Sequence, residues 1–389
     1  SKTTLDSGAT ALPTRSYRAG VIGHTGRGGF SHGLDVAFAG LPGVGIVAVA
    51  DPDEDGRRRC VEKTSTGAES PPRGYADYRE MLAREALDLV AVAPTDLDQR
   101  EVMVTAAAEA GVRAIYCEKP LAQSLEQADR MLAACDARGV KIAVAHQNRS
   151  FPAPRLVQRL IAGGKIGRLR RLRAWPKQDS RGGGLELLIH GTHMFDLMRL
   201  FAGDGRWCHG RVIAGGRDAT AHDAHQGQYA TGLIAGDDIS AEYGFDSGVV
   251  GEFESMVSDD GGGSEYLHME VSGSAGTLAF WSEIGSPVYF TLRPYALPDV
   301  WDEWERIQPE PVAVPTGFSR LHPGNQALVR DLLAAVEEDR APDSSGHDAR
   351  AALEMVLAAY ESHRQGKRVT LPLAERAHPL ERWMAETAT

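Results

Sequence analysis

The stretch YRAGVIGHTGRGGFSHGLDVAFAGLPGVGIVAVAD, residues 17–51, decides the fold. An apolar segment from Tyr17 to Ile22 runs into a glycine-rich loop. A second apolar segment, residues 45–50, ends at Asp51. Between the two, apolar side chains recur with helical spacing at Leu34, Val36, Ala37, Phe38 and Leu41. Strand, glycine loop, helix, strand and acid in this order predict a dinucleotide-binding βαβ unit, with a plain glycine-rich turn as the alternative.

The glycine loop and Asp51 carry the predicted cofactor contacts. Glycine is needed where the backbone turns sharply and where it approaches a pyrophosphate, which N–H groups at the following helix start then bind. In the pattern GxGxxG, Thr25 stands in place of the middle glycine. A carboxylate at Asp51 accepts from both adenosine ribose hydroxyls and repels a 2′-phosphate, so we expect NAD rather than NADP. The loop residues expected at the cofactor are Gly23, Thr25, Gly26, Arg27 and Gly28.

A second stretch marks the edge of the same sheet. The mostly apolar run from Val112 to Cys117 ends abruptly in Glu118, Lys119 and Pro120. This pattern predicts a buried strand that ends at the sheet edge, where ligands bind in open α/β sheets. A lysine in a partly dry cleft at this edge has a lowered pKa and can pass protons. The alternative for Lys119 is a surface ion pair that follows a strand.

Strands alternate with helical stretches up to about residue 148, which predicts a parallel, doubly wound sheet. One of these strands, residues 87–93, ends at Pro94 and Thr95. Beyond residue 150, a glycine run at 182–184 leads into helical spacing that ends at Gly203. From Arg211 to about Val314 the chain is expected to form antiparallel β-structure, with hairpins at 241–253 and 268–280.

We therefore predict an α/β chain in three parts. Residues 1–16 are a disordered or extended tail, and residues 17–148 are a Rossmann dinucleotide-binding domain. Residues 149–389 form a second domain that combines helices with antiparallel β-structure.

Composition excludes several classes of protein. The chain has 389 residues, long enough for two domains, and its net charge of −11 argues against a nucleic-acid surface. It lacks an apolar run of about 18 residues, which argues against a membrane span. Its four cysteines lack CxxC spacing, which indicates reduced thiols of a cytoplasmic protein rather than a disulfide framework or a zinc site.

Several motifs occur in order along nearly the whole chain. They are the glycine loop, Asp51-Pro52, Ala93-Pro94-Thr95, Glu118-Lys119-Pro120, Asn148-Arg149-Ser150-Phe151, the helix with His193-Met194-Phe195-Asp196, and Asn325 followed by the helix of Glu354 and Tyr360. In this combination the chain resembles the Gfo/Idh/MocA oxidoreductases, the family of glucose–fructose oxidoreductase and inositol dehydrogenase. The resemblance implies that residues 149–389 are an α+β domain for substrate binding and oligomerisation, with a large, open, mainly antiparallel sheet. It also implies an active site between the two domains, and a homodimer or homotetramer formed through the C-terminal sheet.

The resemblance also implies roles for individual residues. Lys119 stands between cofactor and substrate, and Glu118, Pro94 and Thr95 are at the cofactor. His193 is the acid–base group, because an imidazole matches neutral pH and takes the O–H proton while the C–H bond delivers hydride to nicotinamide. Asp196, one helical turn further on, orients the ring or contacts the substrate.

Two positions depart from the family pattern. The polyol dehydrogenases of the family have an aspartate four residues before the catalytic histidine, and Ile189 stands there in this chain. His190, on the same helical face as His193, and Glu186 are the candidates to replace it. The histidine that often follows the Pro94 strand is Asp98 here. A substrate other than free inositol or glucose fits these changes.

The substrate contacts expected in this chain each have a structural alternative. Trp175 beside Lys177 offers a sugar an aromatic face and a polar group. The alternative for Asn148 and Arg149 is that they are turn residues at a strand end. The alternative for His190 is a hydrogen-bonded core histidine, and that for Asp196 is a backbone cap. His24 and His32 are expected to be incidental, and the loop 222–225 is expected to be solvated rather than to bind a metal. The expected substrate contacts are Asn148, Arg149, Lys177, His190 and Asp196.

Three functions are consistent with these residues. The first is an NAD-dependent dehydrogenase that oxidises a secondary hydroxyl of a sugar, an inositol-like polyol or a glycoside, with His193 and Lys119 as catalytic groups. The second is a glycosidase or lyase that uses tightly bound NAD for transient C3 oxidation, which the change at Ile189 favours. The third is a non-catalytic binding protein, against which Lys119 and His193 argue.

Overall fold

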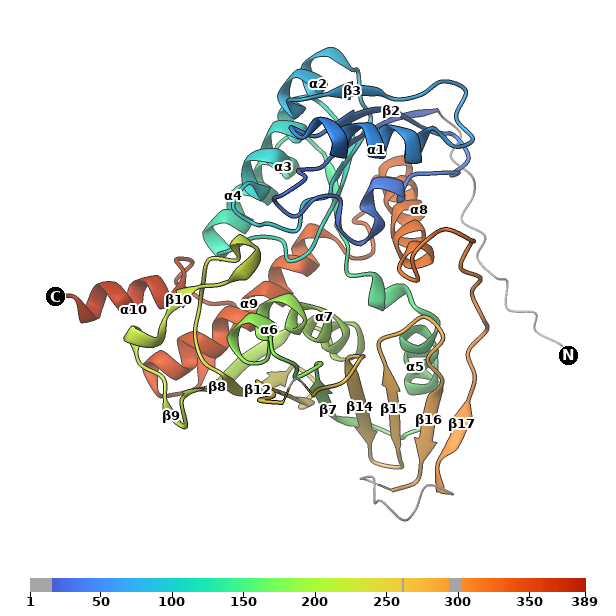
Figure 1. The fold of residues 1–389 in the computed structure, drawn as a ribbon. Coiled ribbons are helices and arrows are strands. Elements are labelled where there is room, and N and C mark those ends of the chain that lie inside the picture. The colour runs from blue at the N-terminus through green and yellow to red at the C-terminus, as the bar shows by residue number, and fades with distance from the viewer. Residues whose placement is uncertain (1–15, 261, 294–302) are drawn as a thin grey trace, which may run out of the picture.

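Two β-sheets, with a layer of helices between them, organise the chain (Figure 1). The computed structural model describes residues 16–260, 262–293 and 303–389. All but the last residue of the predicted tail, and residues 294–302 of the predicted antiparallel region, lie outside the described part of the chain.

The N-terminal sheet has six parallel strands in the order β3-β2-β1-β4-β5-β6. Its strands are β1 Tyr17–Ile22, β2 Val44–Ala50, β3 Arg73–Tyr75, β4 Leu89–Val92, β5 Ala114–Cys117 and β6 Lys141–Val144. Strands β4 and β5 are buried along their whole length, which is why they appear in the sequence as continuous apolar runs. The prediction of a parallel, doubly wound sheet is confirmed. The helices of this region are α1 Glu54–Ser65, α2 Tyr78–Arg84, α3 Arg100–Glu109 and α4 Leu125–Asp136.

The prediction of an α-helix after the glycine loop is wrong. The chain forms only a short 3₁₀ helix, η1 Ser31–Val36, in which His32 and Gly33 have φ of 51° and 74°. This left-handed kink and the left-handed Gly40 prevent a continuous helix. Its apolar side chains are nevertheless buried, because α8 (His322–Glu338) packs against them and against this face of the sheet. A helix from late in the chain therefore takes the place that the sequence suggested for a local one (Figure 1).

The C-terminal sheet has ten strands among the described residues, in the order β17-β16-β15-β14-β7-β13-β12-β8-β18, with β9 beside β8. All neighbours are antiparallel except β7 and β13. The two predicted hairpins are confirmed as the pairs β12–β13 and β14–β15. The strands are β7 Leu169–Trp175, β8 Gly205–Ala214, β9 Arg217–Asp218, β12 Asp238–Phe245, β13 Val250–Met256, β14 His268–Gly273, β15 Thr277–Trp281, β16 Val288–Thr291, β17 Glu305–Ile307 and β18 Val369–Thr370.

Helices cover only one face of this sheet. Gly210 of β8 meets Ala359 of α9, whereas the alternating neighbours His209 and Arg211 line a hollow on the opposite face. The remaining helices are α5 Pro152–Ala162, α6 Gly184–Ile189, α7 Gly191–Ala202, α9 Gly346–Gln365 and α10 Pro379–Thr387. Short segments complete the region: η2 Gln147–Ser150, η3 Ala221–Asp223, η4 Gln228–Ala230, and the ribbon of β10 His225–Gln226 with β11 Leu233–Ile234. No helix among the described residues is both long and apolar enough to cross a membrane.

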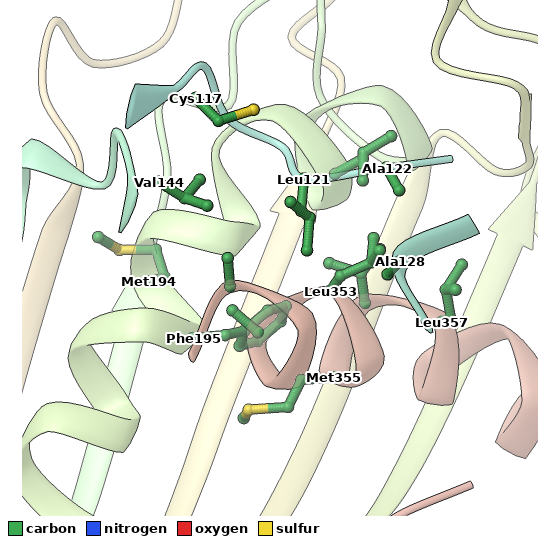
Figure 2. Close-up of a cluster of buried hydrophobic side chains, with 14 of the residues drawn as sticks. Cys117, Leu121, Ala122, Ala128, Val144, Met194, Phe195, Leu353, Met355 and Leu357 are labelled. Carbon is green, nitrogen blue, oxygen red and sulfur yellow. The ribbon is translucent and has the colours of Figure 1, made fainter. Parts of the chain in front are cut away.

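One hydrophobic core joins the two regions. Leu121 and Ala122, which follow the Lys119–Pro120 pair, share it with Phe195 of α7 and Leu353 of α9 (Figure 2). The same cluster contains Cys117 at the end of β5. Because this core is continuous, it fixes the edge of the N-terminal sheet relative to α7. All four cysteines are buried free thiols, as expected.

Candidate active site

The stretch Glu118-Lys119-Pro120 lies at the carboxyl edge of β5 and is held in place by Arg100. Arg100 is 1% exposed and begins α3. Its guanidinium donates to the carbonyl oxygens of Glu118 and Pro120, and to that of Pro94 at 2.7 Å. Arg100 thus joins two neighbouring strand ends that the sequence placed at the cofactor. Sequence reasoning missed it, because a single arginine at a helix start is normally solvated.

Glu118 and Lys119 are buried but remain charged. The Nδ1 atom of His32 is 2.7 Å from Oε2 of Glu118. Burial alone would raise the pKa of Glu118, but His32, Lys119 and Arg100 together lower it to about 2. The pKa of Lys119 is lowered to about 8, mainly by burial and also by Arg100, against the opposing effect of Glu118. His32 is therefore part of the site, and the expectation that it is incidental is wrong.

The predicted helical segment after the glycine run is broken at His190. Helix α6 ends at Ile189 and α7 begins at Gly191. The break leaves the carbonyl of Ile189 free to accept from Nζ of Lys119 at 2.7 Å. This contact links the N-terminal sheet edge to the helices that carry the histidines.

His190 has a carboxylate partner. Its Nδ1 is 2.9 Å from Oε1 of Glu186, which is completely buried. Glu186 also accepts from Ser255 Oγ at 2.5 Å and from the backbone N–H of Gln178 at 3.0 Å. Burial lowers the pKa of His190, as does Lys119, whereas the hydrogen bond to Glu186 raises it.

Among the described residues, His193 has no such carboxylate partner. Its Nδ1 is buried without a hydrogen bond, and its ring meets that of His146 edge-on at 5.2 Å. Burial lowers its pKa well below the usual value, and the neighbouring Lys119 adds to the effect. The expectation that Asp196 orients this ring is wrong. Both oxygens of Asp196 accept from Arg149, with Nε and Nη2 each at 2.8 Å.

A cavity of about 320 Å³ brings most of the expected substrate residues together. Its wall includes Lys119, His190, His193, Asn148 and Lys177. The structure does not bring Arg149 and Asp196 to this wall, because they pair with one another. Trp175 is also elsewhere, on the open face of the C-terminal sheet. The remaining lining is His32, Gln147, Phe151, Glu265, Tyr266, Leu267, Ser282, Glu283, Ile284, Arg320 and Leu321.

A second cavity, of about 470 Å³, lies at the carboxyl ends of β1 and β2 and is lined by Gly23, Arg27 and Pro52 among others. Asp51 is buried next to it and accepts from the backbone N–H of Thr25 at 3.1 Å and from its hydroxyl at 2.6 Å. Thr25 therefore holds the carboxylate in position at the end of β2.

The glycine loop has the room that a dinucleotide needs. A Cβ at Gly26 would meet nothing within 4 Å, and its φ of +85° suits glycine. A Cβ at Gly28 would lie 2.4 Å from the backbone nitrogen of Thr95, so only glycine lets these two loops touch. Arg27 pairs with Asp98, the residue that departs from the family pattern, and lies 3.7 Å from Asp96. These residues would hold a dinucleotide at the carboxyl ends of β1 and β2.

Two family models match the chain in order. The model described as the NAD-binding Rossmann fold of an oxidoreductase family matches residues 17–146, and the C-terminal alpha/beta domain of the same family matches residues 161–371. The chain belongs to the GFO/IDH/MocA oxidoreductase family. NAD is accordingly the cofactor of its Rossmann domain. When bound, NAD exchanges a hydride with the substrate, and the glycine loop and Asp51 would hold it.

Relatives in this family include several named dehydrogenases. The chain is 28% identical over 395 residues to a D-apiose dehydrogenase of Paraburkholderia graminis, covering 95% of this chain and 94% of that protein. It is 27% identical over 267 residues to a levoglucosan dehydrogenase of Pseudarthrobacter phenanthrenivorans, covering 62% and 65%. A solved levoglucosan dehydrogenase in complex with NADH and levoglucosan has the same fold, with a TM-score of 0.72 at 20% identity, covering 92% of this chain and all of that one.

Proposed function

We propose that this oxidoreductase oxidises a secondary hydroxyl of a sugar, a polyol or a glycoside with NAD. The observation that carries the proposal is the cavity at the junction of the two regions, where the buried ammonium of Lys119 meets the imidazoles of His190 and His193. The names of the relatives support a carbohydrate substrate: D-apiose, levoglucosan and, over 39% of this chain at 34% identity, inositol in Saccharopolyspora erythraea.

The residues of the cavity offer the charge stabilisation, the proton acceptor and the hydrogen-bonding groups that alcohol oxidation needs. The ammonium of Lys119 is charged below pH 8 and stabilises the oxygen on which negative charge develops. An imidazole of the cavity takes the hydroxyl proton, and the family resemblance gives this role to His193. The amides of Gln147 and Asn148 offer donors and acceptors to further hydroxyl groups.

The second candidate is a redox-neutral glycosidase or lyase that retains its NAD. Ile189, in place of the family's aspartate, motivates it. A relative named 2,7-anhydro-N-acetylneuraminate hydratase, from Mediterraneibacter gnavus, is 29% identical over 46% of this chain, which keeps this reaction class in consideration.

The test is to mix the purified protein with NAD and a panel of pentoses, anhydrosugars, inositols and glycosides, and to follow NADH absorbance and aglycone release. The proposal expects stoichiometric NADH from at least one sugar. Aglycone release without net NADH would favour the second candidate. No NADH and no bound dinucleotide would refute the first.

Two lysine variants sharpen this test. Lys119→Ala should abolish turnover, whereas Lys141→Ala, which removes an ammonium paired with Asp339 outside the cavity, should not. Activity that survives Lys119→Ala would show that this ammonium is not required for turnover. NAD binding by the unmodified protein without turnover of any substrate would return a non-catalytic binding role to consideration.

We also propose that the open face of the C-terminal sheet makes the subunit contacts of a homodimer or homotetramer. An apolar hollow on this face, lined by Trp175, Trp281, Tyr289 and Trp304, supports the proposal.

A further inference from the structure

The Glu186–His190 pair has a geometry suited to proton transfer. The hydrogen bond between Glu186 and Nδ1 of His190 fixes the plane and tautomer of the ring, which leaves Nε2 for the cavity that His190 lines. The His190 side chain is 11% exposed and that of Glu186 is 0% exposed. An imidazole held by a buried carboxylate, with one free nitrogen, is the arrangement of a general base.

Three neighbouring groups form hydrogen bonds with the side chain of Glu186. Its oxygens accept from Gln178 N–H, Ser255 Oγ and the His190 ring, and no lysine or arginine forms a salt bridge with it among the described residues. Within the described part of the chain, the imidazole is thus the only titratable side chain that is hydrogen-bonded to Glu186. A proton that arrives on His190 completes a buried ion pair.

His193 faces the opposite electrostatic situation. Burial disfavours a positive His193 most strongly, and the neighbouring Lys119, His146, His190 and His32 each add to that effect. Its buried Nδ1 would also carry an N–H without an acceptor in the protonated ring. His193 is therefore suited to binding a hydroxyl as a neutral imidazole, and poorly suited to holding the proton.

We propose that His190, positioned by Glu186, accepts the hydroxyl proton of the substrate, while His193 holds the same hydroxyl as a neutral imidazole. This assignment rests on the proposed dehydrogenase function. The O–H bond breaks, its electron pair forms the C=O bond, the carbinol hydride goes to NAD and the proton goes to Nε2 of His190. The protonated ring then releases the proton to solvent at the cavity mouth. His190 is the catalytic residue and Glu186 is a positioning residue.

The charged and titratable neighbours of His190 determine what a pH profile should show. Glu186 raises its pKa, while Lys119 and Arg181 lower it; Asp179, paired with Arg181, and His193 also face it. Since the base must be neutral for oxidation, kcat/KM should fall on the acid side through the pKa of His190. On the alkaline side it should fall through the pKa of Lys119, about 8.

Three variants of the NAD-loaded enzyme test the assignment with the sugar found active in the panel. Glu186→Gln should move the acid limb to lower pH, because a carboxylate that raises the pKa of His190 is gone. It should also lower kcat at least about tenfold with KM little changed, and leave the alkaline limb in place. His190→Gln should lower kcat by about 10² to 10⁴ and remove the acid limb. His193→Asn should mainly raise KM and keep the acid limb.

The matched control is Glu361→Gln. Glu361 is also buried, but its partners are Arg364 and Arg382 and it does not line the cavity. Its pH profile should equal that of the unmodified enzyme. NADH binding and thermal unfolding of each variant show whether the fold is kept, and the Glu186→Gln profile decides the matter if His190→Gln does not fold.

The inference is overturned if Glu186→Gln and His190→Gln keep kcat within about twofold and keep the acid limb, while His193→Asn loses both. Failure of the proposed function looks different, because the unmodified enzyme would then form no NADH with any sugar.

Discussion

Removing the guanidinium of Arg100 should lower the free energy of unfolding and weaken cofactor binding. Arg100→Met keeps the length and much of the volume of the side chain but deletes every donor. Those donors serve the carbonyl oxygens of Glu118, Pro120, Pro94 and, at 3.3 Å, Thr95.

The size of the effect follows from burial. A buried acceptor that loses its donor costs roughly 1–3 kcal/mol, and four carbonyl oxygens share this one guanidinium. Part of this loss is offset, because the variant no longer buries a positive charge, and burying an arginine is itself unfavourable. We expect the free energy of unfolding to fall by about 4 kcal/mol.

Urea denaturation followed by tryptophan fluorescence measures this change. Arg130→Met is the matched control, because Arg130 is exposed and pairs with Glu101 on the surface, where a loss below about 1 kcal/mol is expected. NADH titration should show weaker binding to Arg100→Met only. An unfolding free energy for Arg100→Met within about 1 kcal/mol of the unmodified protein would refute the reasoning.

Three further predictions follow. His146 is buried with neither ring nitrogen bonded, and burial lowers its pKa to about 4. The unfolded chain therefore binds more protons than the folded one between pH 6.5 and 4, so the free energy of unfolding should fall by roughly 3 kcal/mol as the pH drops through that window. In His146→Leu the difference between the unfolding free energies measured at pH 7 and pH 4.5 should be smaller. Asp51→Ala should raise KM for NAD about tenfold and reduce the preference over NADP, and an unchanged ratio would contradict the role of Asp51. Trp281→Glu, on the open sheet face, should yield smaller species in sedimentation velocity, whereas equal sizes would exclude that face as the interface.

Much of the fold was predictable because it depends on local patterns. The continuous apolar runs of β4 and β5 specify strands that are buried on both faces. Lys119 comes shortly after β5 in the sequence, which places it at the edge of the sheet. The start of helix α4 is likewise a local feature, because the side chain of Ser124 accepts from Gln127 N–H. The two hairpins of the C-terminal sheet followed from alternation around short turns.

The parts that were not predictable depend on contacts between distant residues. Helix α8 covers the sheet face next to the glycine loop, so a local α-helix is not needed there, and no local pattern indicates this replacement. His32 pairs with Glu118, which lies 86 positions later. Asp196 is at the right spacing to reach His193 but binds Arg149 instead, because a bidentate guanidinium is the stronger partner.

The histidines show the same limit within one segment. Sequence spacing placed His190 and His193 on one face of a helix, but the chain breaks at His190 and gives the two rings different surroundings. His190 is hydrogen-bonded to a buried carboxylate, whereas burial and the neighbouring Lys119 oppose the protonation of His193. Which ring holds a proton is a property of these surroundings, and spacing alone does not contain it.

Isotope transfer tests the central claim most directly. The unmodified enzyme is incubated with NAD and the perdeuterated form of each sugar in the panel, and the nicotinamide product is examined by mass spectrometry. The proposed dehydrogenase function predicts that NADH carries one deuterium from the carbinol carbon, and that Lys119→Ala abolishes the transfer. Nicotinamide that stays unlabelled with every sugar, in a protein that binds NAD, would contradict hydride transfer in this cavity.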